Sequence, residues 1–140
     1  MTQDFPITIY HNPDCGTSRN VVAMVAAAGY TPRIVEYLKT PWTLLLLKEL
    51  LAAMDATPQA ILREKGTPAR ELALLDADVT EETILREMVA HPILVNRPIV
   101  VTPKGVKLCR PSEAVLALLE RRPESFTKED GEVVRLSGSF

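Results

Sequence analysis

The 140-residue sequence has few cysteines, almost no excess of one charge and no long apolar run. Its two cysteines cannot build a disulfide scaffold, so each is expected to be either a buried hydrophobe or a reactive thiol. Sixteen basic and eighteen acidic residues leave a formal charge of −2, which gives no global basic field for nucleic acid or an anionic membrane. Any anion binding must therefore be local.

Membrane and export signals are also missing. The longest leucine run, Leu44–Leu47, stops at Lys48 and falls far short of the ~20 apolar residues of a membrane span. Residues 1–6 carry no basic region with an apolar stretch behind it, so we expect no secretory signal and a cytoplasmic protein. The leucine-rich segment 44–51, with Trp42 before it, fits either a helix that covers the core or an exposed patch for a partner.

The length and the 46% apolar content suit one compact domain with a core of its own. The sequence contains no internal repeat, low-complexity segment or second domain boundary, so we expect residues 1–140 to form a single domain. Residues 124–140 are polar, and we expect this tail to be loose.

The first forty residues predict a strand, a helix and a second strand. Residues 7–11 alternate apolar and polar side chains and are rich in β-branched residues, which is typical of a strand. Pro13 stops this strand, and the apolar spacing from Val21 to Ala28 is that of a helix, which Gly29 closes. Residues 33–38 form the second strand, and such a short unit should pair its strands in parallel through a right-handed crossover.

The middle of the chain, about residues 40–91, is predicted to be helical, because its leucines and methionines fall on helix faces. Two strands, 99–102 and 106–109, then flank a turn short enough for an antiparallel hairpin. A last helix begins at Pro111 and ends before Pro123. This order of βαβ, helices and ββα predicts an α/β, thioredoxin-like fold, with a four-stranded mixed sheet and an all-helical insertion.

Cys15 lies at the junction between the first strand and the first helix, in the segment HNPDCGTSRN. Unpaired N–H groups and the positive end of the helix dipole stabilise a thiolate at this position, and such cysteines titrate at about 3.5–7.5. Gly16 leaves the approach open, while Thr17 and Ser18 offer hydroxyl donors beside backbone amides that suit an oxyanion. These residues predict a nucleophilic thiolate; the alternative is that Cys15 is a small buried hydrophobe.

The residues that follow Cys15 exclude two familiar kinds of cysteine site. A Cys-x-x-Cys pair is absent because its fourth residue is Ser18, so a second thiol must come from outside the chain. A Cys-x5-Arg phosphatase loop is also absent, since Val21 stands where its arginine belongs. Cys109 lies on an alternating strand, and we expect it to be structural.

Three segments together, HNPDCGTSRN, HPILVNRPIVVTPKG and LCRPSE, resemble the glutaredoxin-dependent arsenate reductases of the ArsC/Spx family. The likeness runs from about Ile7 to Asp130. It implies that Cys15 attacks arsenate to give a cysteine thioarsenate, that glutathione then joins the arsenic, and that glutaredoxin reduces this adduct so that arsenite leaves. Arsenate, glutathione as a co-substrate and glutaredoxin are the partners that the likeness implies, with no tightly bound cofactor.

The resemblance also assigns three arginines to the oxyanion: Arg63 in ILRE, Arg97 in VNRP and Arg110 in LCRP. Arsenate is a tetrahedral, phosphate-like anion, and planar guanidinium groups give it two-pronged hydrogen bonds and a permanent positive charge. They can also stabilise the charge that develops as hydroxide departs. Without the likeness, each arginine could be a solvated or salt-bridged surface group.

Three further positions carry predictions. His11 matches a family position that supports activity, through hydrogen bonds that keep the nucleophile loop in place; a merely structural histidine is the alternative. Arg97–Pro98 resembles the cis-proline position of thioredoxin-like proteins, so we predict a cis bond there. His91 should cap or pack the end of a helix, and the spacing of histidines and cysteines predicts no metal site.

Three rival functions can be compared on these residues. A regulatory protein of the same superfamily, which binds RNA polymerase and senses oxidation, typically carries Cys-x-x-Cys, where this chain has Ser18. A glutathione-dependent thiol oxidoreductase needs Cys15 but not all three arginines. Because the chain retains Arg63, Arg97 and Arg110 together with Cys15, arsenate reduction is favoured over both, and over a phosphatase.

Overall fold

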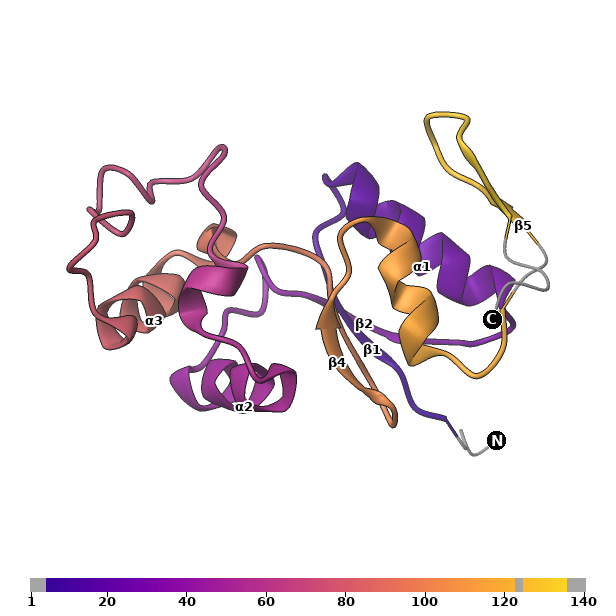
Figure 1. Ribbon diagram of the computed structural model, residues 1–140, viewed down its shortest axis with the longest axis horizontal. Helices are drawn as coiled ribbons and strands as arrows, with labels where there is room; N and C mark the ends of the chain where they lie inside the picture. The colour runs from indigo at the N-terminus through magenta and orange to yellow at the C-terminus, as the bar shows by residue number, and fades with distance from the viewer. Residues whose placement is uncertain (1–4, 123–124, 136–140) are drawn as a thin grey trace. The chain divides into compact units, whose positions relative to one another are not determined.

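The computed structural model describes residues 5–122 and 125–135, and the chain divides into two compact units. The first unit consists of the chain up to Glu36 together with the chain from Arg97 onward, and the second unit is Tyr37–Asn96. Figure 1 shows the elements of both units, coloured along the chain. Each unit is described in turn.

The first unit contains a four-stranded mixed sheet, as predicted. Strand β1 (Thr8–His11) lies between β2 (Arg33–Glu36) and β3 (Ile99–Thr102), and β4 (Gly105–Leu108) pairs with β3 to give the order β2-β1-β3-β4. The β1–β2 pair is parallel and the other two pairs are antiparallel. The prediction of a βαβ start followed by a hairpin is therefore confirmed, with strand ends that differ from the expected ones by one or two residues.

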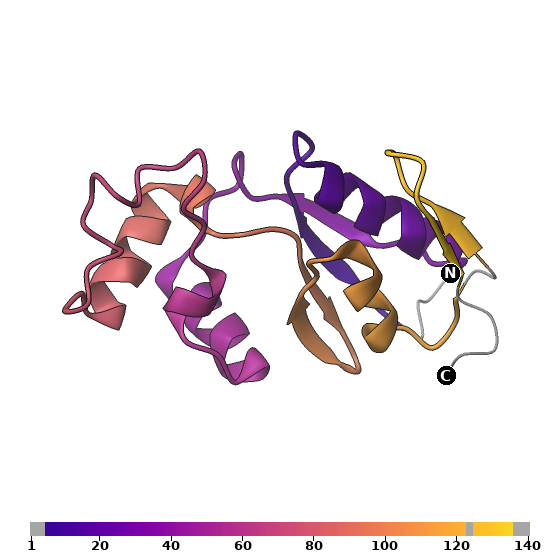
Figure 2. The ribbon, with the colours of Figure 1, turned by 45° about the horizontal axis from the view of Figure 1, so that its top comes forward.

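Two helices cover one face of this sheet. Helix α1 (Gly16–Ala27) packs beside η3 (Ser112–Leu118), and Figure 2 shows the two helices next to each other over the strands. The last predicted helix is thus present, but it is a 3-10 helix. The shared core consists of apolar side chains from strands, α1 and η3 that are at most 5% exposed: Ile7, Ile9, Val21, Met24, Val25, Val100, Cys109, Val115, Leu116, Leu118 and Leu119.

The described part of the tail contains a small hairpin, which was not predicted from the sequence. Strands β5 (Ser125–Thr127) and β6 (Val133–Arg135) form a two-stranded antiparallel sheet, drawn in yellow in Figure 1. Phe126 and Val134 pack against the core of the first unit, and this apolar contact explains why a mostly polar segment is ordered. Glu124 and residues 136–140 lie outside the described residues.

The second unit is helical only in part. It contains α2 (Leu44–Met54), η1 (Pro58–Ile61), α3 (Glu81–Ala90) and η2 (Pro92–Leu94). The continuous helical region predicted for residues 40–91 is wrong between residues 62 and 80, which form a single β-bridge and a series of turns.

The turns have a local cause. The Thr67 hydroxyl donates to the Arg63 carbonyl at 2.7 Å and accepts from the Ala69 N–H at 3.2 Å, so a side chain takes backbone partners that a helix would use. Pro68 offers no N–H donor, and Gly66 has a φ of +73°, a left-handed conformation that ends a helix.

The leucine-rich helix of the second unit mainly covers a core. Leu47, Leu50 and Leu51 are buried on one face of α2, whereas Leu45 is 68% exposed on the other. Trp42 is buried and stacks on Tyr37 at a centroid distance of 4.9 Å. Of the two interpretations left open by the sequence, core packing holds for most of this segment.

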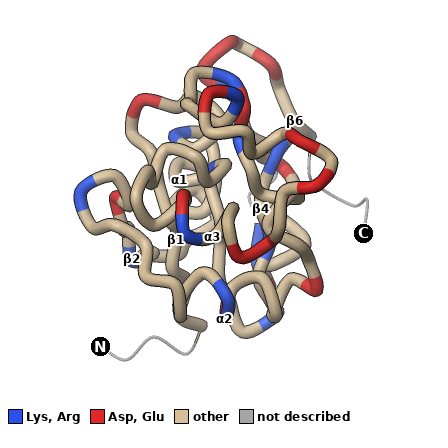
Figure 3. Tube along the Cα trace, turned by 90° about the vertical axis from the view of Figure 1, so that its left-hand side faces the viewer, with Lys and Arg blue, Asp and Glu red and all other residues tan. Residues whose placement is uncertain are grey.

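Charged residues of both signs are distributed along the whole chain. In Figure 3 the blue and red segments are interspersed, without a long stretch of one sign, which agrees with the small net charge. No helix among the described residues is long and apolar enough to cross a membrane.

Candidate active site

The Cys15 thiol lies where the sequence placed it, at the N-terminus of α1. Cys15 is the N-cap residue, with an extended backbone, and its N–H donates to the Asn12 carbonyl at 3.0 Å. Its own carbonyl accepts from the Arg19 N–H at 2.9 Å and so begins the helix. The residue is 8% exposed, which leaves only a narrow approach to the sulfur.

The surroundings of Cys15 favour its thiolate. Burial by itself raises the pKa of this thiol, but hydrogen bonds from the Arg97 side chain, the Ser18 backbone N–H and the Arg110 side chain outweigh burial. Together with the charge of Arg97, they lower the pKa to about 7. A thiol whose pKa lies near the ambient pH combines a large thiolate fraction with high intrinsic nucleophilicity. These surroundings favour the interpretation of Cys15 as a nucleophile over that of an inert buried hydrophobe.

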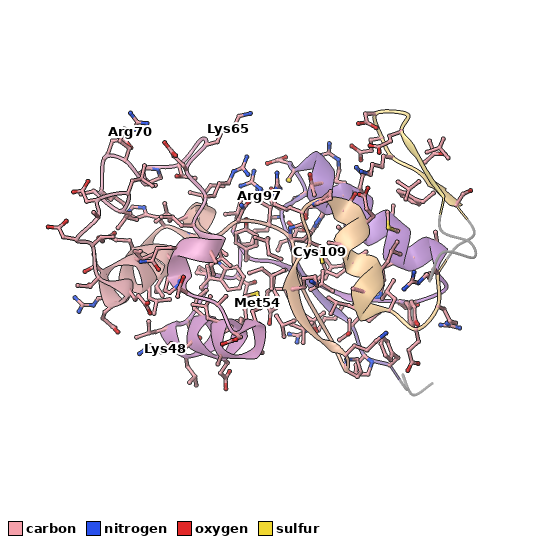
Figure 4. The ribbon with its side chains drawn as sticks, viewed as in Figure 1. Lys48, Met54, Lys65, Arg70, Arg97 and Cys109 are labelled. Carbon is pink, nitrogen blue, oxygen red and sulfur yellow. The ribbon has the colours of Figure 1, made fainter. Side chains whose placement is uncertain are left out.

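Two of the three predicted arginines meet at the sulfur. Arg110 Nη1 lies 3.7 Å from Cys15 Sγ and also donates to the Arg97 carbonyl at 2.9 Å, which ties the two arginine segments together. Arg97 is buried, and its side chain is labelled in Figure 4. The Arg97–Pro98 bond is cis, as predicted, and Arg110–Pro111 is a second cis bond that the sequence did not suggest.

Ser18 holds the loop before the nucleophile. Its hydroxyl lies 2.6 Å from His11 Nδ1 and accepts from the Asn12 N–H at 3.1 Å, with all three residues buried. The Ser18 hydroxyl was predicted to face an oxyanion, but it forms hydrogen bonds within the loop. The backbone N–H of Ser18 donates to the Cys15 sulfur. Gly16 and Thr17, the other two predicted oxyanion residues, form the half-buried start of α1 beside it.

His11 joins the end of β1 to the first turn of α1 through this contact with Ser18. Burial is the main reason that the pKa of His11 is lowered; the nearby Glu36 carboxylate opposes the shift and Arg19 adds to it. Burial therefore favours the neutral form of His11. Its position suits the predicted loop-holding role, and its effect on activity stays a prediction.

Arg63, the third predicted arginine, belongs to the second unit. Its backbone N–H donates to the Leu94 carbonyl at 2.8 Å, beside the antiparallel bridge between Leu62 and Val95. Its side chain donates from Nη1 to Asn96 Oδ1 at 3.2 Å and from Nε to the Lys65 carbonyl at 3.1 Å. Asn96 is the last residue of the second unit and directly precedes Arg97 in the chain.

The second cysteine takes no part in this cluster. Cys109 is fully buried in the core where β4 leads toward η3 (Figure 4), and its Sγ contacts the Lys107 carbonyl at 3.6 Å. Burial raises its pKa to about 12, so this thiol is inert at neutral pH, in agreement with the structural role expected for it.

The remaining predictions concern His91 and metals. His91 is the C-cap of α3 and lies 3.7 Å from the Glu87 carboxylate, so the predicted capping role is confirmed. Among the residues that the structure describes, no three His, Cys, Asp or Glu side chains gather closely enough to hold a metal ion.

The fold and the site together define a class. A reactive thiol at the junction of the first strand and helix, a mixed four-stranded sheet and a cis-proline segment characterise a thiol-dependent protein of the thioredoxin-like fold. Two guanidinium groups lie at the sulfur, and guanidinium is a group that binds oxyanions well. Residues 10–118 match the ArsC family, and the chain belongs to that family.

Similar proteins support this assignment. The chain is 58% identical over 135 residues to an arsenate reductase of Synechocystis sp., covering 96% of this chain and 93% of that protein. It is 50% identical to an arsenate reductase of Escherichia coli K12, covering 91% and 92% of the two chains. The solved structure of an arsenate reductase from Vibrio cholerae aligns with a TM-score of 0.79 at 33% identity, over 84% of this chain and all of that one.

Some contacts at the site were not predictable from the sequence. The sequence gives only a weak indication of the Ser18–His11 hydrogen bond, namely that the two residues lie on either side of Cys15 near the start of the first helix. The Arg63–Asn96 contact and an ion pair between Arg19 and Glu129 join residues 33 and 110 positions apart. No local pattern in the sequence connects such distant partners.

Proposed function

We propose that this protein is an arsenate reductase in which the Cys15 thiolate is the nucleophile. One observation carries the proposal: a thiol with a pKa of about 7 is contacted by two guanidinium groups, in a chain closely similar to arsenate reductases. A thiolate and an oxyanion repel each other, and the positive charges of Arg97 and Arg110 offset this repulsion. The site is therefore suited to a reaction between two anions.

The first step is a displacement at arsenic. The Cys15 sulfur donates an electron pair to As(V), an As–S bond forms, and an As–O bond breaks as a protonated oxygen leaves as water. Guanidinium donors stabilise the charge on the remaining oxygens during this exchange. Arg97 and Arg110 are assigned this task because they contact the sulfur, and Arg63 is assigned to the same anion through the family likeness alone.

The second and third steps use external thiols. Glutathione displaces a second oxygen as water, which gives an arsenic atom bonded to both sulfurs. A glutaredoxin thiolate then attacks the glutathione sulfur and forms a glutaredoxin–glutathione disulfide. The S–As electron pair stays on arsenic, so As(V) becomes As(III). Water next displaces the Cys15 sulfur from arsenic, so that arsenite leaves and the thiolate is restored.

The need for an external thiol is supported by the fate of the second cysteine. Cys109 is buried with a pKa of about 12, so it is a poor candidate to reduce an adduct on Cys15. Glutathione and glutaredoxin are proposed as the electron donors, the protein is proposed to work in the cytoplasm, and no tightly bound cofactor is needed by this scheme.

The test is the arsenate-dependent oxidation of NADPH, coupled through glutathione reductase, glutathione and glutaredoxin. Wild type should turn over only when glutaredoxin is present, Cys15→Ser should be inactive, and Arg97→Ala should lose most activity. Arg121→Ala removes an arginine that lies over the Tyr30 ring, 4.4 Å from its centroid, and serves as the matched control with unchanged activity. A folded wild type without arsenate-dependent turnover would contradict the proposal and favour a glutathione-linked oxidoreductase or a regulatory protein.

A further inference from the structure

A fourth arginine at the rim of the nucleophile loop already holds a carboxylate. Arg19 donates from Nε to Glu129 Oε2 at 2.8 Å and from Nη2 to Glu129 Oε1 at 3.0 Å, a two-pronged pair between α1 and the β5–β6 hairpin. Such parallel hydrogen bonds are the geometry in which guanidinium groups recognise carboxylates specifically. Arg19 is thus oriented for a carboxylate ligand.

This guanidinium lies beside the nucleophile. Arg19 follows Cys15 by one helical turn, and its Nη1 donates to the Pro13 carbonyl at 2.7 Å, within the loop that precedes the thiol. A Cβ placed on Gly16, the residue next to Cys15, would lie 3.7 Å from Arg19 Nη2 and 3.8 Å from Glu129 Oε1. The ion pair therefore borders the approach to the sulfur.

The Glu129 side chain can leave without moving the hairpin. The Arg19 and Glu129 side chains are 43% and 49% exposed, and water screens an exposed pair of this kind, so it contributes little to stability. The hairpin has other anchors, since the Glu129 N–H donates to Asn20 Oδ1 at 3.1 Å and Lys128 Nζ lies 2.8 Å from Glu113 Oε1. An incoming carboxylate has only the Glu129 side chain to displace.

We propose that Arg19 binds a carboxylate of the glutathione that reacts at Cys15, and that Glu129 is its intramolecular competitor. The dimensions are compatible, because the glycine carboxylate of glutathione lies about 7 Å along the chain from its cysteine, and residues one helical turn apart are separated by about 5–6 Å. This inference rests on the proposed function for the identity of the thiol. The chemical feature that it requires is a thiol or disulfide with a carboxylate on the residue next to the cysteine.

Disulfide exchange without arsenate tests the inference separately. The Cys15 thiolate attacks one sulfur of oxidised glutathione, the S–S bond breaks, a Cys15–glutathione disulfide forms, and one glutathione thiolate leaves with the bonding pair. Intact-protein mass spectrometry follows this adduct over time. The matched reagent is bis(2-hydroxyethyl) disulfide, which undergoes the same exchange and carries no carboxylate.

Three variants are compared with both disulfides. Arg19→Ala should slow the reaction with oxidised glutathione about two- to five-fold, and Glu129→Gln should speed it by a similar factor. Neither substitution should change the rate with bis(2-hydroxyethyl) disulfide to the same extent. Glu132→Gln, which removes a hairpin carboxylate that pairs with Lys128, should change nothing.

Equal effects on the two disulfides, or an unchanged rate with oxidised glutathione in both Arg19→Ala and Glu129→Gln, would overturn the inference. Because the disulfide exchange needs no arsenate, its result does not depend on the outcome of the coupled assay. If arsenate turnover is absent but the preference for oxidised glutathione depends on Arg19, the carboxylate site holds and the arsenate proposal fails.

Discussion

Replacing Arg97 by alanine should change the titration of Cys15 as well as the binding of an oxyanion. Arg97 provides the foremost hydrogen bond that lowers the pKa of this thiol, and its charge adds to the effect. In Arg97→Ala burial remains while this contact is lost, so the pKa of Cys15 should rise from about 7. An opposite charge in contact with a titrating group typically shifts its pKa by about 1–3 units.

The size of the effect depends on the pH of the measurement. With a pKa of about 7, half of the Cys15 thiols are ionised at pH 7. A rise by one unit leaves about a tenth ionised, a roughly five-fold loss of thiolate. The more basic thiolate is intrinsically about three-fold more nucleophilic, so the alkylation rate at pH 7 should fall only about two-fold, whereas the rate at high pH should rise about three-fold.

The assay is the rate of alkylation by iodoacetamide, a neutral reagent, measured across the pH range from 5 to 10. Cys109 stays silent because it is buried and its pKa is raised to about 12, and Cys15→Ser gives the blank. Arg97→Lys keeps the charge and should give a midpoint between the other two, while Arg121→Ala should keep the wild-type midpoint. An Arg97→Ala profile that coincides with wild type would refute the assignment of Arg97 to the thiolate.

Three other perturbations have defined outcomes. Asn96→Ala should raise the KM for arsenate a few-fold, because Arg63 loses a hydrogen-bond partner at 3.2 Å. When Arg63 is already replaced by alanine, the Asn96→Ala substitution should raise the KM little further. Full additivity in this double-mutant cycle would exclude action of Asn96 through Arg63. Met24→Ala in the core of the first unit should lower the free energy of unfolding by about 2–5 kcal/mol in urea denaturation, and a loss below 1 kcal/mol would contradict the packing described. The pKa of Cys15 is depressed in the folded state, so its contribution to stability is present above the unfolded pKa of about 9 and is lost as the pH falls toward 7. Wild type should therefore gain about 1–2 kcal/mol over Cys15→Ser between pH 7 and pH 9, and a constant difference would show that the thiolate is not stabilised by the fold.

The first unit could be predicted well because its signals are local. Period-two alternation marks β1 and β4, and the Val21, Met24 and Val25 spacing marks α1. A short βαβ unit pairs its two strands in parallel. The thiol position followed directly from the same pattern, since a cysteine between a strand and a helix must lie at the helix N-terminus.

The errors have a common physical origin in contacts that a window of sequence does not contain. Residues 62–80 are rich in helix-compatible side chains, yet Thr67 and Pro68 divert the backbone into turns. The β5–β6 hairpin packs through Phe126 and Val134 against the core of the first unit, which lies far away in the sequence. The hydroxyl of Ser18 faces His11 because β1 ends beside the first turn of α1, which only the fold determines.

The most direct measurement of the proposed chemistry follows the arsenic itself. Wild type and Cys15→Ser are incubated with arsenate, glutathione and glutaredoxin, and the arsenic species are separated and quantified with time. Wild type should convert arsenate to arsenite in amounts that exceed the enzyme, and Cys15→Ser should form none above the enzyme-free reaction. Arsenite formation by Cys15→Ser at the wild-type rate would contradict a mechanism that begins at this thiolate.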